Sequence, residues 1–384
     1  MTWDITGILI VVVKALVVFA ALLLMVPLLI WMERKIVADI QIRIGPNRAG
    51  PFGILQPFAD AVKLFFKEDI IAREADKTLY FLAPIASMAP ALTMFAVIPF
   101  GDAVKIAGRR VVLQVADVNV GILFILAISS LAVYGVVLAG WSSSNKYSLL
   151  GGVRSAAQMI SYELPLGIAL VGPIILSGSL TLREIVFAQG RAGMWFIAPQ
   201  FLSFATYMIS GFAETNRAPF DLPEAEQELT AGYHTEYSSF RFAMFFMAEY
   251  VNMVTVSAVA VTFFLGGWRG LFANIVILQP VWFLVKVFAI LCVMMWVRAT
   301  FPRLRYDKLM KFGWKVLIPV SLFNLMLTAS AKALAPQSAV LILSVISLTL
   351  AAVGGGVVGA AALRAMRKQP RLAAPGGAFY EWRS

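Results

Sequence analysis

Apolar stretches long enough to cross a lipid bilayer recur along nearly the whole chain of 384 residues. A helix needs about 20 apolar residues to cross the hydrocarbon core. Only 14% of the residues are charged, against about 25% in soluble globular proteins. We therefore predict an all-α, polytopic transmembrane bundle of about nine spans in one integral membrane domain, 1–384. The predicted spans are 7–32, 79–99, 119–141, 156–178, 195–213, 242–266, 277–297, 313–334 and 338–362.

The distribution of lysine and arginine predicts the orientation of the chain. Loops 33–78, 142–155, 214–241 and 298–315, together with the C-terminal tail, hold 23 of the 32 basic residues, and the opposite loops hold seven. Cytoplasmic loops are the basic ones, so we expect the N-terminus outside and the C-terminus in the cytoplasm. The net charge of +11 is then explained by topology and contact with anionic lipids, without nucleic acid.

Cysteine and histidine usage excludes several cofactors. Cys292 is the only cysteine and His234 the only histidine. One cysteine cannot ligate an iron–sulfur cluster or a structural zinc ion, and one histidine cannot provide bis-histidine haem ligation. We expect no metal site, and we expect any iron–sulfur cluster, flavin or haem to belong to a partner.

A short amphipathic helix is predicted within the first cytoplasmic loop, from Pro57 to Lys67. Proline suits the first turn of a helix, and the polar side chains lie on one face. Such a helix would lie in the membrane interface beside the cytoplasmic end of the first span. The expected apolar face consists of Phe58, Ala61, Val62, Phe65 and Phe66.

Three carboxylates and one lysine lie in or at the end of predicted spans: Glu163, Glu214, Glu249 and Lys286. A charge at the centre of a bilayer costs about 2.5–3.5 kcal/mol on translocon scales, so such residues usually have a role. Burial favours the neutral carboxyl, and a series of such groups can pass protons. The alternative is that they form structural ion pairs or reach the membrane interface.

Four acidic residues crowd into the loop after the fifth span: Asp221, Glu224, Glu226 and Glu228. Carboxylates this close titrate as a coupled set, which suits proton collection or charge sensing. Two other readings stay open, an acidic first turn that complements a helix dipole and a solvated docking surface. Earlier in the chain, three glycines and two prolines between Arg43 and Gly53 predict a tight, fixed turn. This turn lacks the lysine and hydroxyl residue of a phosphate-binding loop.

Ordered sequence segments give the chain a resemblance to the H subunit of bacterial NADH–quinone oxidoreductase (complex I), the equivalent of mitochondrial NADH dehydrogenase subunit 1. The resemblance covers an eight-span core of about 5–335. The span 338–362 and the cytoplasmic tail 363–384 then look like a C-terminal extension. The segments are Glu33–Lys35, Arg43–Gly53, Leu55–Ala61, Lys63–Leu64 with Lys67–Glu68, Ser161–Glu163, Glu214–Leu229, Gly232–Tyr237, Phe245–Tyr250 and Arg303–Asp307.

The resemblance implies a subunit of a proton-translocating enzyme complex in the bacterial inner membrane, not catalytic alone. With a peripheral subunit it would form a cavity for ubiquinone or menaquinone, lined here by Arg34, Arg43, Phe58, Asp60 and Phe65. Its other implied partners are the small membrane subunits next to the antiporter-like ones, and lipids. Implied roles are a proton relay for Glu163, Glu214 and Glu249, coupling for Asp221, Glu224, Glu226 and Glu228, and contact with the peripheral arm for Arg303 and Arg305.

Three rival functions remain at this point. One is the membrane anchor of an energy-converting hydrogenase, which pumps ions without quinone; the stretch from Arg43 to Lys67 favours the quinone branch. Another is a stand-alone proton or cation transporter, which would work without partners. A purely structural anchor is disfavoured because it has no need of intramembrane carboxylates.

Overall fold

The computed structural model describes residues 5–106, 109–221, 230–271 and 275–368, and nearly all regular structure there is helical. Seven helical segments in these ranges are long and apolar enough to cross a membrane, which confirms the multi-pass all-α bundle. They contain α1 (Ile5–Ile40), α3 (Lys77–Met94), α4 (Gly121–Ser142), α5 (Lys146–Ser177), α9 (Ser239–Phe264), α10 (Leu278–Thr300) and α12 (Ile318–Leu334). The last is continuous with α11 (Tyr306–Phe312) through a π-helical turn, Gly313–Leu317.

The fifth predicted span differs from a full membrane crossing. It contains α7 (Phe201–Glu214), whose 14 residues extend only about 21 Å against the roughly 30 Å hydrocarbon core. Pro199 explains the late start, because proline lacks the N–H that a helix interior needs. The ninth predicted span corresponds to α13 (Ala339–Lys368), which packs against α7 and α12.

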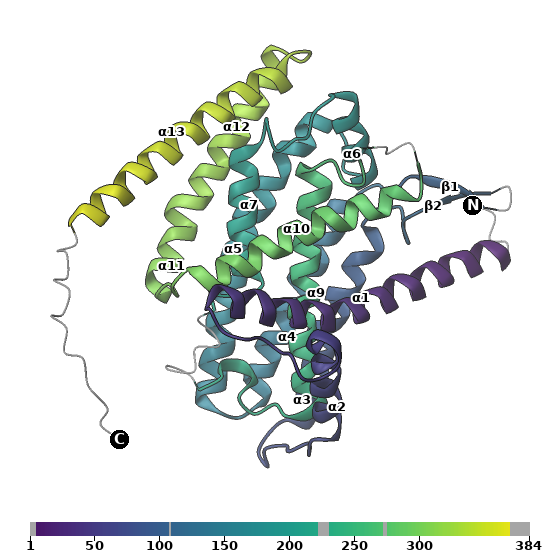
Figure 1. Cartoon of the computed structure of the whole chain (residues 1–384), viewed down its shortest axis with the longest axis vertical. Helices are drawn as coiled ribbons and strands as arrows, with labels where there is room; N and C mark the ends of the chain where they lie inside the picture. The colour runs from purple at the N-terminus through teal and green to yellow at the C-terminus, as the bar shows by residue number, and fades with distance from the viewer. Residues whose placement is uncertain (1–4, 107–108, 222–229, 272–274, 369–384) are drawn as a thin grey trace, which may run out of the picture.

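Two helices are much longer than their predicted spans. α5 begins ten residues before the predicted start at 156, because the side chain of Asn145 accepts a hydrogen bond from the Tyr147 N–H at 3.0 Å and caps the helix. α1 continues beyond Met32 to Ile40, so Glu33 lies within the helix rather than in a loop. Its 36 residues extend about 54 Å, and Figure 1 shows it lying across the direction of α12.

Shorter elements connect the spans. The predicted amphipathic helix is confirmed as α2 (Gln56–Phe66), which follows a 3₁₀ turn, Pro51–Gly53. Further 3₁₀ turns are Phe95–Val97 and Gly232–His234. Two connecting elements were not predicted: a hairpin of β1 (Ala103–Ile106) and β2 (Arg109–Val112), with Ala103 opposite Val112, and the helix α6 (Leu182–Arg191).

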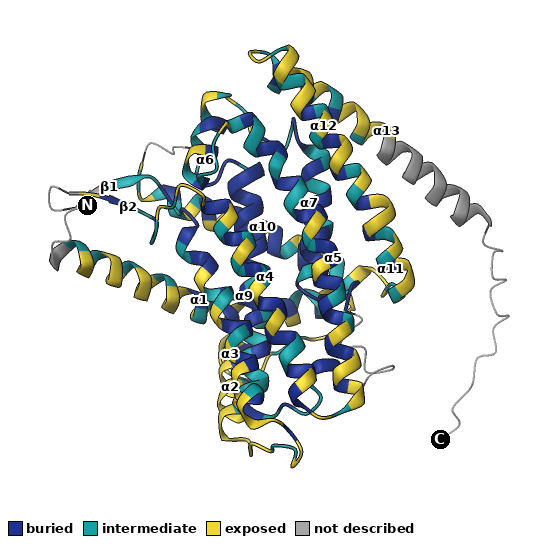
Figure 2. Ribbon diagram, turned by 180° about the vertical axis from the view of Figure 1, so that it is seen from behind, coloured by how far each residue is buried: buried dark blue, intermediate teal, exposed yellow. Residues whose placement is uncertain are grey.

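The core of the bundle lies around α9, which is buried over most of its length (Figure 2). Val251, Ala258 and Phe264 on this helix pack with buried side chains from its neighbours α10 and α7. Figure 2 shows the opposite pattern on α1, whose N-terminal half is largely exposed. Because the exposed apolar residues lie on a membrane-spanning helix, lipid rather than water is their expected surrounding.

Candidate functional site

A network of buried charges is centred on Glu33, near the C-terminal end of α1. Its carboxylate accepts a hydrogen bond from the Tyr250 hydroxyl at 2.9 Å and lies 3.5 Å from Nη1 of Arg217. Arg298, on α10, forms a second ion pair with it. Glu33 is only 7% exposed, so these cations and the hydroxyl replace the water that an ionised carboxylate needs.

Arg217 connects Glu33 to a second carboxylate. Its Nη2 atom lies 3.9 Å from an oxygen of Glu249, whose other oxygen accepts a hydrogen bond from Tyr233 at 3.1 Å. The guanidinium also lies 4.1 Å from the centre of the Tyr250 ring, which adds a cation–π contact. Arg217 therefore bridges two acidic groups contributed by α1 and α9.

A polar cavity of about 730 Å³ opens beside this network. Glu33 and Arg298 contribute to its wall, and so do three further residues that the sequence had placed in separate groups. These three are Arg34 and Arg43, predicted for a quinone cavity, and Arg303, predicted for contact with a peripheral arm. Asp221 completes the set and pairs with Arg303 at 3.2 Å. The other wall residues are Val37, Ala38, Gln41, Ile44, Gly45, Pro46, Ala218, Ala299, Phe301 and Pro302.

The other predicted cavity residues lie nearby but do not all reach the wall. Asp60 on α2 forms an ion pair with Arg34 at 2.7 Å, so it borders the cavity through its partner. Phe58 and Phe65 lie exposed on the surface of α2, where apolar side chains suit a membrane interface. Arg305 is exposed and pairs with Asp307 at 3.5 Å. Glu224, Glu226 and Glu228 lie outside the described residues.

One small cavity is lined by both Glu249 and Glu214, and a second is lined by Glu214 but not by Glu249. Each has a volume of about 30 Å³, enough for a water molecule, and Glu214 lines both. Glu249 lines one of them, and so does Ser87, whose hydroxyl has no hydrogen-bond partner among the described residues. Asn252 lines both, and its side-chain oxygen is likewise unpaired within the described part of the chain.

Glu163 lies beyond the second of these cavities. The hydroxyl of Ser130 on α4 donates a hydrogen bond to its carboxylate and also lies 2.9 Å from the carbonyl oxygen of Leu126, a residue of the cavity wall. Glu163 is also close enough to Glu214 for their charges to interact. The three carboxylates predicted as a relay thus form a series with Glu33 at its cavity end.

Lys286 and His234 lie outside the series of carboxylates, and their contacts explain their burial in structural terms. The Lys286 ammonium donates to the carbonyls of Leu265 at 2.7 Å and Gly267 at 3.0 Å, and to that of Arg269. It therefore satisfies carbonyls of the turn that follows α9. Burial lowers the pKa of His234 below its usual range, although the nearby Glu249 carboxylate opposes this. Among the described residues, no cluster of His, Cys, Asp and Glu could hold a metal ion.

Sequence reasoning missed Glu33, Arg217 and Arg298 as functional residues. Each was assigned to a cytoplasmic loop, where a charge needs no partner. One signal was available, because Glu33 directly follows an apolar run that could continue as a helix. The convergence of Arg217 and Arg298 on Glu33 depends on tertiary packing across some 180 residues or more, and no local pattern encodes it.

Comparisons with known proteins agree with this architecture. The profile of the family described as NADH dehydrogenase matches residues 13–329. A protein of Protochlamydia amoebophila, named as the H subunit of NADH-quinone oxidoreductase, is 56% identical over 78% of this chain and 90% of the relative. A Geobacter sulfurreducens protein, named as an H subunit of the same enzyme, is 52% identical over 83% and 93%. The Frankia casuarinae H subunit is 55% identical, over 80% of this chain and 70% of the relative. The chain therefore belongs to the NADH dehydrogenase family.

Proposed function

We propose that this chain is the membrane subunit of a proton-translocating NADH–quinone oxidoreductase that forms part of the quinone cavity and couples quinone reduction to proton movement. The observation that carries the proposal is the series of buried and half-buried polar groups that leads from the 730 Å³ cavity through Glu33, Arg217 and Glu249 towards Glu214 and Glu163. The similarity to proteins named as H subunits of NADH-quinone oxidoreductase favours this branch over a hydrogenase anchor or a free-standing transporter.

The cavity suits the head group of a quinone. The two carbonyl oxygens of a quinone accept hydrogen bonds. The donors around the cavity wall are the guanidinium groups of Arg34, Arg43, Arg298 and Arg303. Val37, Ile44 and Phe301 supply apolar surface for the ring and the first part of the tail. In this proposal the peripheral subunits complete the cavity and deliver the electrons, because a chain with one cysteine cannot ligate an iron–sulfur cluster.

Reduction of a quinone to a quinol takes two electrons and two protons, so the charge in the cavity changes during turnover. Asp221, which faces Arg303, is the proposed first group to respond. Glu33 and Glu249 share Arg217, so a change of charge on one alters how strongly Arg217 is held by the other. Water in the two small cavities would extend this response to Glu214 and Glu163.

Proton-translocation measurements test the relay. In the intact complex in membrane vesicles, Glu249→Gln should abolish NADH-driven proton uptake or release while the protein still assembles. Glu184→Gln is the matched control, because Glu184 lies in an exposed pair with Arg191 on α6. Full proton translocation by Glu249→Gln or Glu163→Gln would remove that residue from the relay.

A photoreactive quinone analogue tests the cavity separately. Labelling should fall on residues 34–46 and 298–303, the two segments that contribute most of the wall. Labelling that avoids both segments would refute the cavity assignment. Purification distinguishes a transporter from a subunit, since a subunit should copurify with the NADH-oxidising partners.

The orientation and the C-terminal extension are also proposals. We infer that the N-terminus is outside, which membrane-impermeant labelling of a cysteine introduced at Thr2, in a Cys292→Ser background, would test. We infer that α13 is an addition to a core of about 5–335, because the family match ends at 329. Deleting residues 338–384 should therefore leave quinone reduction intact, whereas loss of assembly would make α13 part of the core.

A further inference from the structure

The N-terminal half of α1 stands apart from the bundle. Leu9, Leu16 and Val17 are each about 60% exposed, whereas Leu22 and Leu29 further along the same helix are buried. The change occurs near Leu22, where α1 begins to pack closely on its neighbours. Two apolar grooves flank the exposed half, one of about 340 Å³ and one of about 510 Å³.

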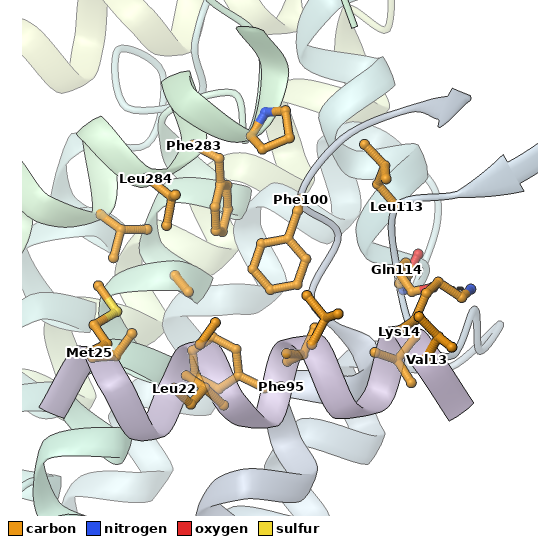
Figure 3. A pocket seen from close by; sticks show the side chains of 18 residues that line it. Val13, Lys14, Leu22, Met25, Phe95, Phe100, Leu113, Gln114, Phe283 and Leu284 are labelled. Atoms are coloured by element: carbon orange, nitrogen blue, oxygen red, sulfur yellow. Dashed lines mark hydrogen bonds between the residues drawn. The ribbon is translucent and has the colours of Figure 1, made fainter. Parts of the chain in front are cut away.

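The smaller groove is walled by aromatic rings. Phe95, Phe100 and Phe283 face α1 across it, and the rings of Phe100 and Phe283 stack edge to face at 5.4 Å (Figure 3). The wall on the α1 side runs from Val13 to Met25. Val254, Ala258 and Val287 close the floor, so nearly all of the lining is apolar.

The dimensions of this groove fit one hydrocarbon chain. The α1 wall rises about 18 Å over the twelve residues from Val13 to Met25, so the groove is long enough for most of an extended acyl chain. A whole helix is about 10 Å wide, so a neighbouring helix could insert only side chains into a groove of 340 Å³.

A cation lies at the end of the groove nearest the N-terminus. The Lys14 ammonium donates to the carbonyl of Gln114 at 2.7 Å and, more weakly, to that of Val112 at 3.4 Å. These are its acceptors within the described residues, so one of its three N–H donors is available. Arg110, two residues before Val112 on β2, is exposed on the same side of the protein.

We propose that this groove binds one acyl chain of an anionic phospholipid, whose phosphate is bound by Lys14. The chain contact comes from the apolar wall, and the preference for an anionic head group comes from the ammonium at its end. The lipid would belong to the leaflet at the N-terminal end of α1, opposite to the polar cavity. An isoprenoid quinone tail is the competing occupant, but its head group is uncharged and gains less from Lys14.

A photoreactive lipid tests the site in the intact complex, reconstituted into phosphatidylcholine vesicles. The probe is phosphatidylglycerol with a diazirine on one acyl chain, and we expect labelled peptides from 13–25 and 283–287. Ala21→Phe fills the groove and should reduce this labelling to background. Ala20→Phe is the matched control, because Ala20 is exposed on the same helix but lines neither groove. Val17→Trp is a second filling variant at a highly exposed position.

Lys14→Gln tests the head-group contact. It should lower the ratio of phosphatidylglycerol to phosphatidylcholine probe labelling about fivefold, the factor expected for one basic residue at an anionic lipid. NADH–quinone reductase activity of each variant checks that the complex is assembled. Unchanged labelling in both Ala21→Phe and Val17→Trp would overturn the acyl-chain site. An unchanged probe ratio in Lys14→Gln would overturn the phosphate contact, and displacement of the probe by an isoprenoid quinone would assign the groove to quinone.

Discussion

The two ends of α1 line two cavities of opposite character. At the C-terminal end the 730 Å³ cavity is walled by four arginines and two carboxylates. At the N-terminal end the 340 Å³ groove is walled by aliphatic and aromatic side chains, with Lys14 as its charged residue. The two segments of α1 explain the difference, because the run before Glu33 is apolar apart from Lys14 whereas charges are frequent after it.

The comparison teaches that burial of charge follows the availability of partners. Glu33 is buried where two arginines and a tyrosine converge on it. Lys14 bonds to two carbonyls at the edge of the protein, which neutralise no charge. A fully paired charge can sit in the interior and respond to chemistry there, whereas a partly solvated one is suited to a lipid head group.

Arg217→Ala should have the largest effect, because it leaves Glu33 and Glu249 buried without their shared cation. Breaking a buried ion pair costs about 3–5 kcal/mol, so assembly of the complex and quinone reduction should both collapse. Arg191→Ala is the control, since Arg191 is 68% exposed and its pair with Glu184 contributes about 1 kcal/mol or less. Thermal unfolding and the yield of purified complex measure the difference. Equal losses of stability and yield in the two variants would show that the buried arginine contributes no more than an exposed one.

Gly53→Ala should have the next largest effect. Gly53 has φ +79°, and an added Cβ atom would lie 2.3 Å from the Pro46 carbonyl oxygen. Backbone strain of this kind costs about 1–3 kcal/mol and would shift Pro46, which lines the polar cavity. The expected result is a raised KM for a short-chain quinone and a lower Tm. Gly7→Ala is the control at the other end of α1, because nothing lies within 4 Å of its added Cβ. An unchanged KM in Gly53→Ala would show that the turn at Gly53 does not set the shape of the quinone cavity.

The sequence predicted the secondary-structure elements of this fold better than the tertiary contacts between them. Apolar runs located a helix for every predicted span, and Pro57 with its apolar neighbours located α2 within one residue. The short length of α7 was not predicted, because hydropathy counts apolar residues whether or not Pro199 lets them form a helix. The helix α6 and the hairpin of β1 and β2 were missed because polar connections carry no long periodic pattern.

The candidate site was only partly predictable for the same reason. Glu163, Glu214 and Glu249 could be recognised because a carboxylate in an apolar run is unusual by itself. Arg217 could not, because it lies in a polar loop and gains its meaning only from Glu33, 184 residues away. The grouping of Arg43, Asp221 and Arg303 in one wall likewise depends on how α1 crosses the bundle.

His234 should make the polar end of the molecule sensitive to pH. Burial lowers its pKa, so the folded protein keeps the imidazole neutral at a pH where the unfolded chain, with a pKa of about 6.5, binds a proton. Stability should therefore fall as the pH drops below about 6.5, by a smaller amount than in Arg217→Ala. Thermal unfolding of the complex between pH 8 and pH 5 should show a shallower fall for His234→Gln. Parallel curves for the two proteins would mean that another group controls this range.

Asp102→Asn should have the smallest effect, although it removes one of the shorter ion pairs in the protein. Asp102 and Arg183 lie 2.5 Å apart on the same side as Lys14, and the aspartate side chain is 40% exposed. Partial burial alone would raise its pKa, but the Ala103 N–H and the Arg183 guanidinium outweigh this and lower it. The pair therefore contributes above the ordinary aspartate pKa and is lost only in stronger acid, as the pH falls through the lowered pKa, so it should not alter the fall between pH 8 and pH 5.

The expected loss for Asp102→Asn is about 1 kcal/mol or less, and it should shrink further in high salt because solvent screens an exposed pair. Thermal unfolding in low and high salt, beside Arg217→Ala, measures both points. The pair at Asp102 is shorter than any contact of Arg217 with Glu33 or Glu249. A loss as large as that of Arg217→Ala would show that distance, rather than burial, sets the contribution of a charge in this protein. The contrast between the two ends of α1 would then need another cause.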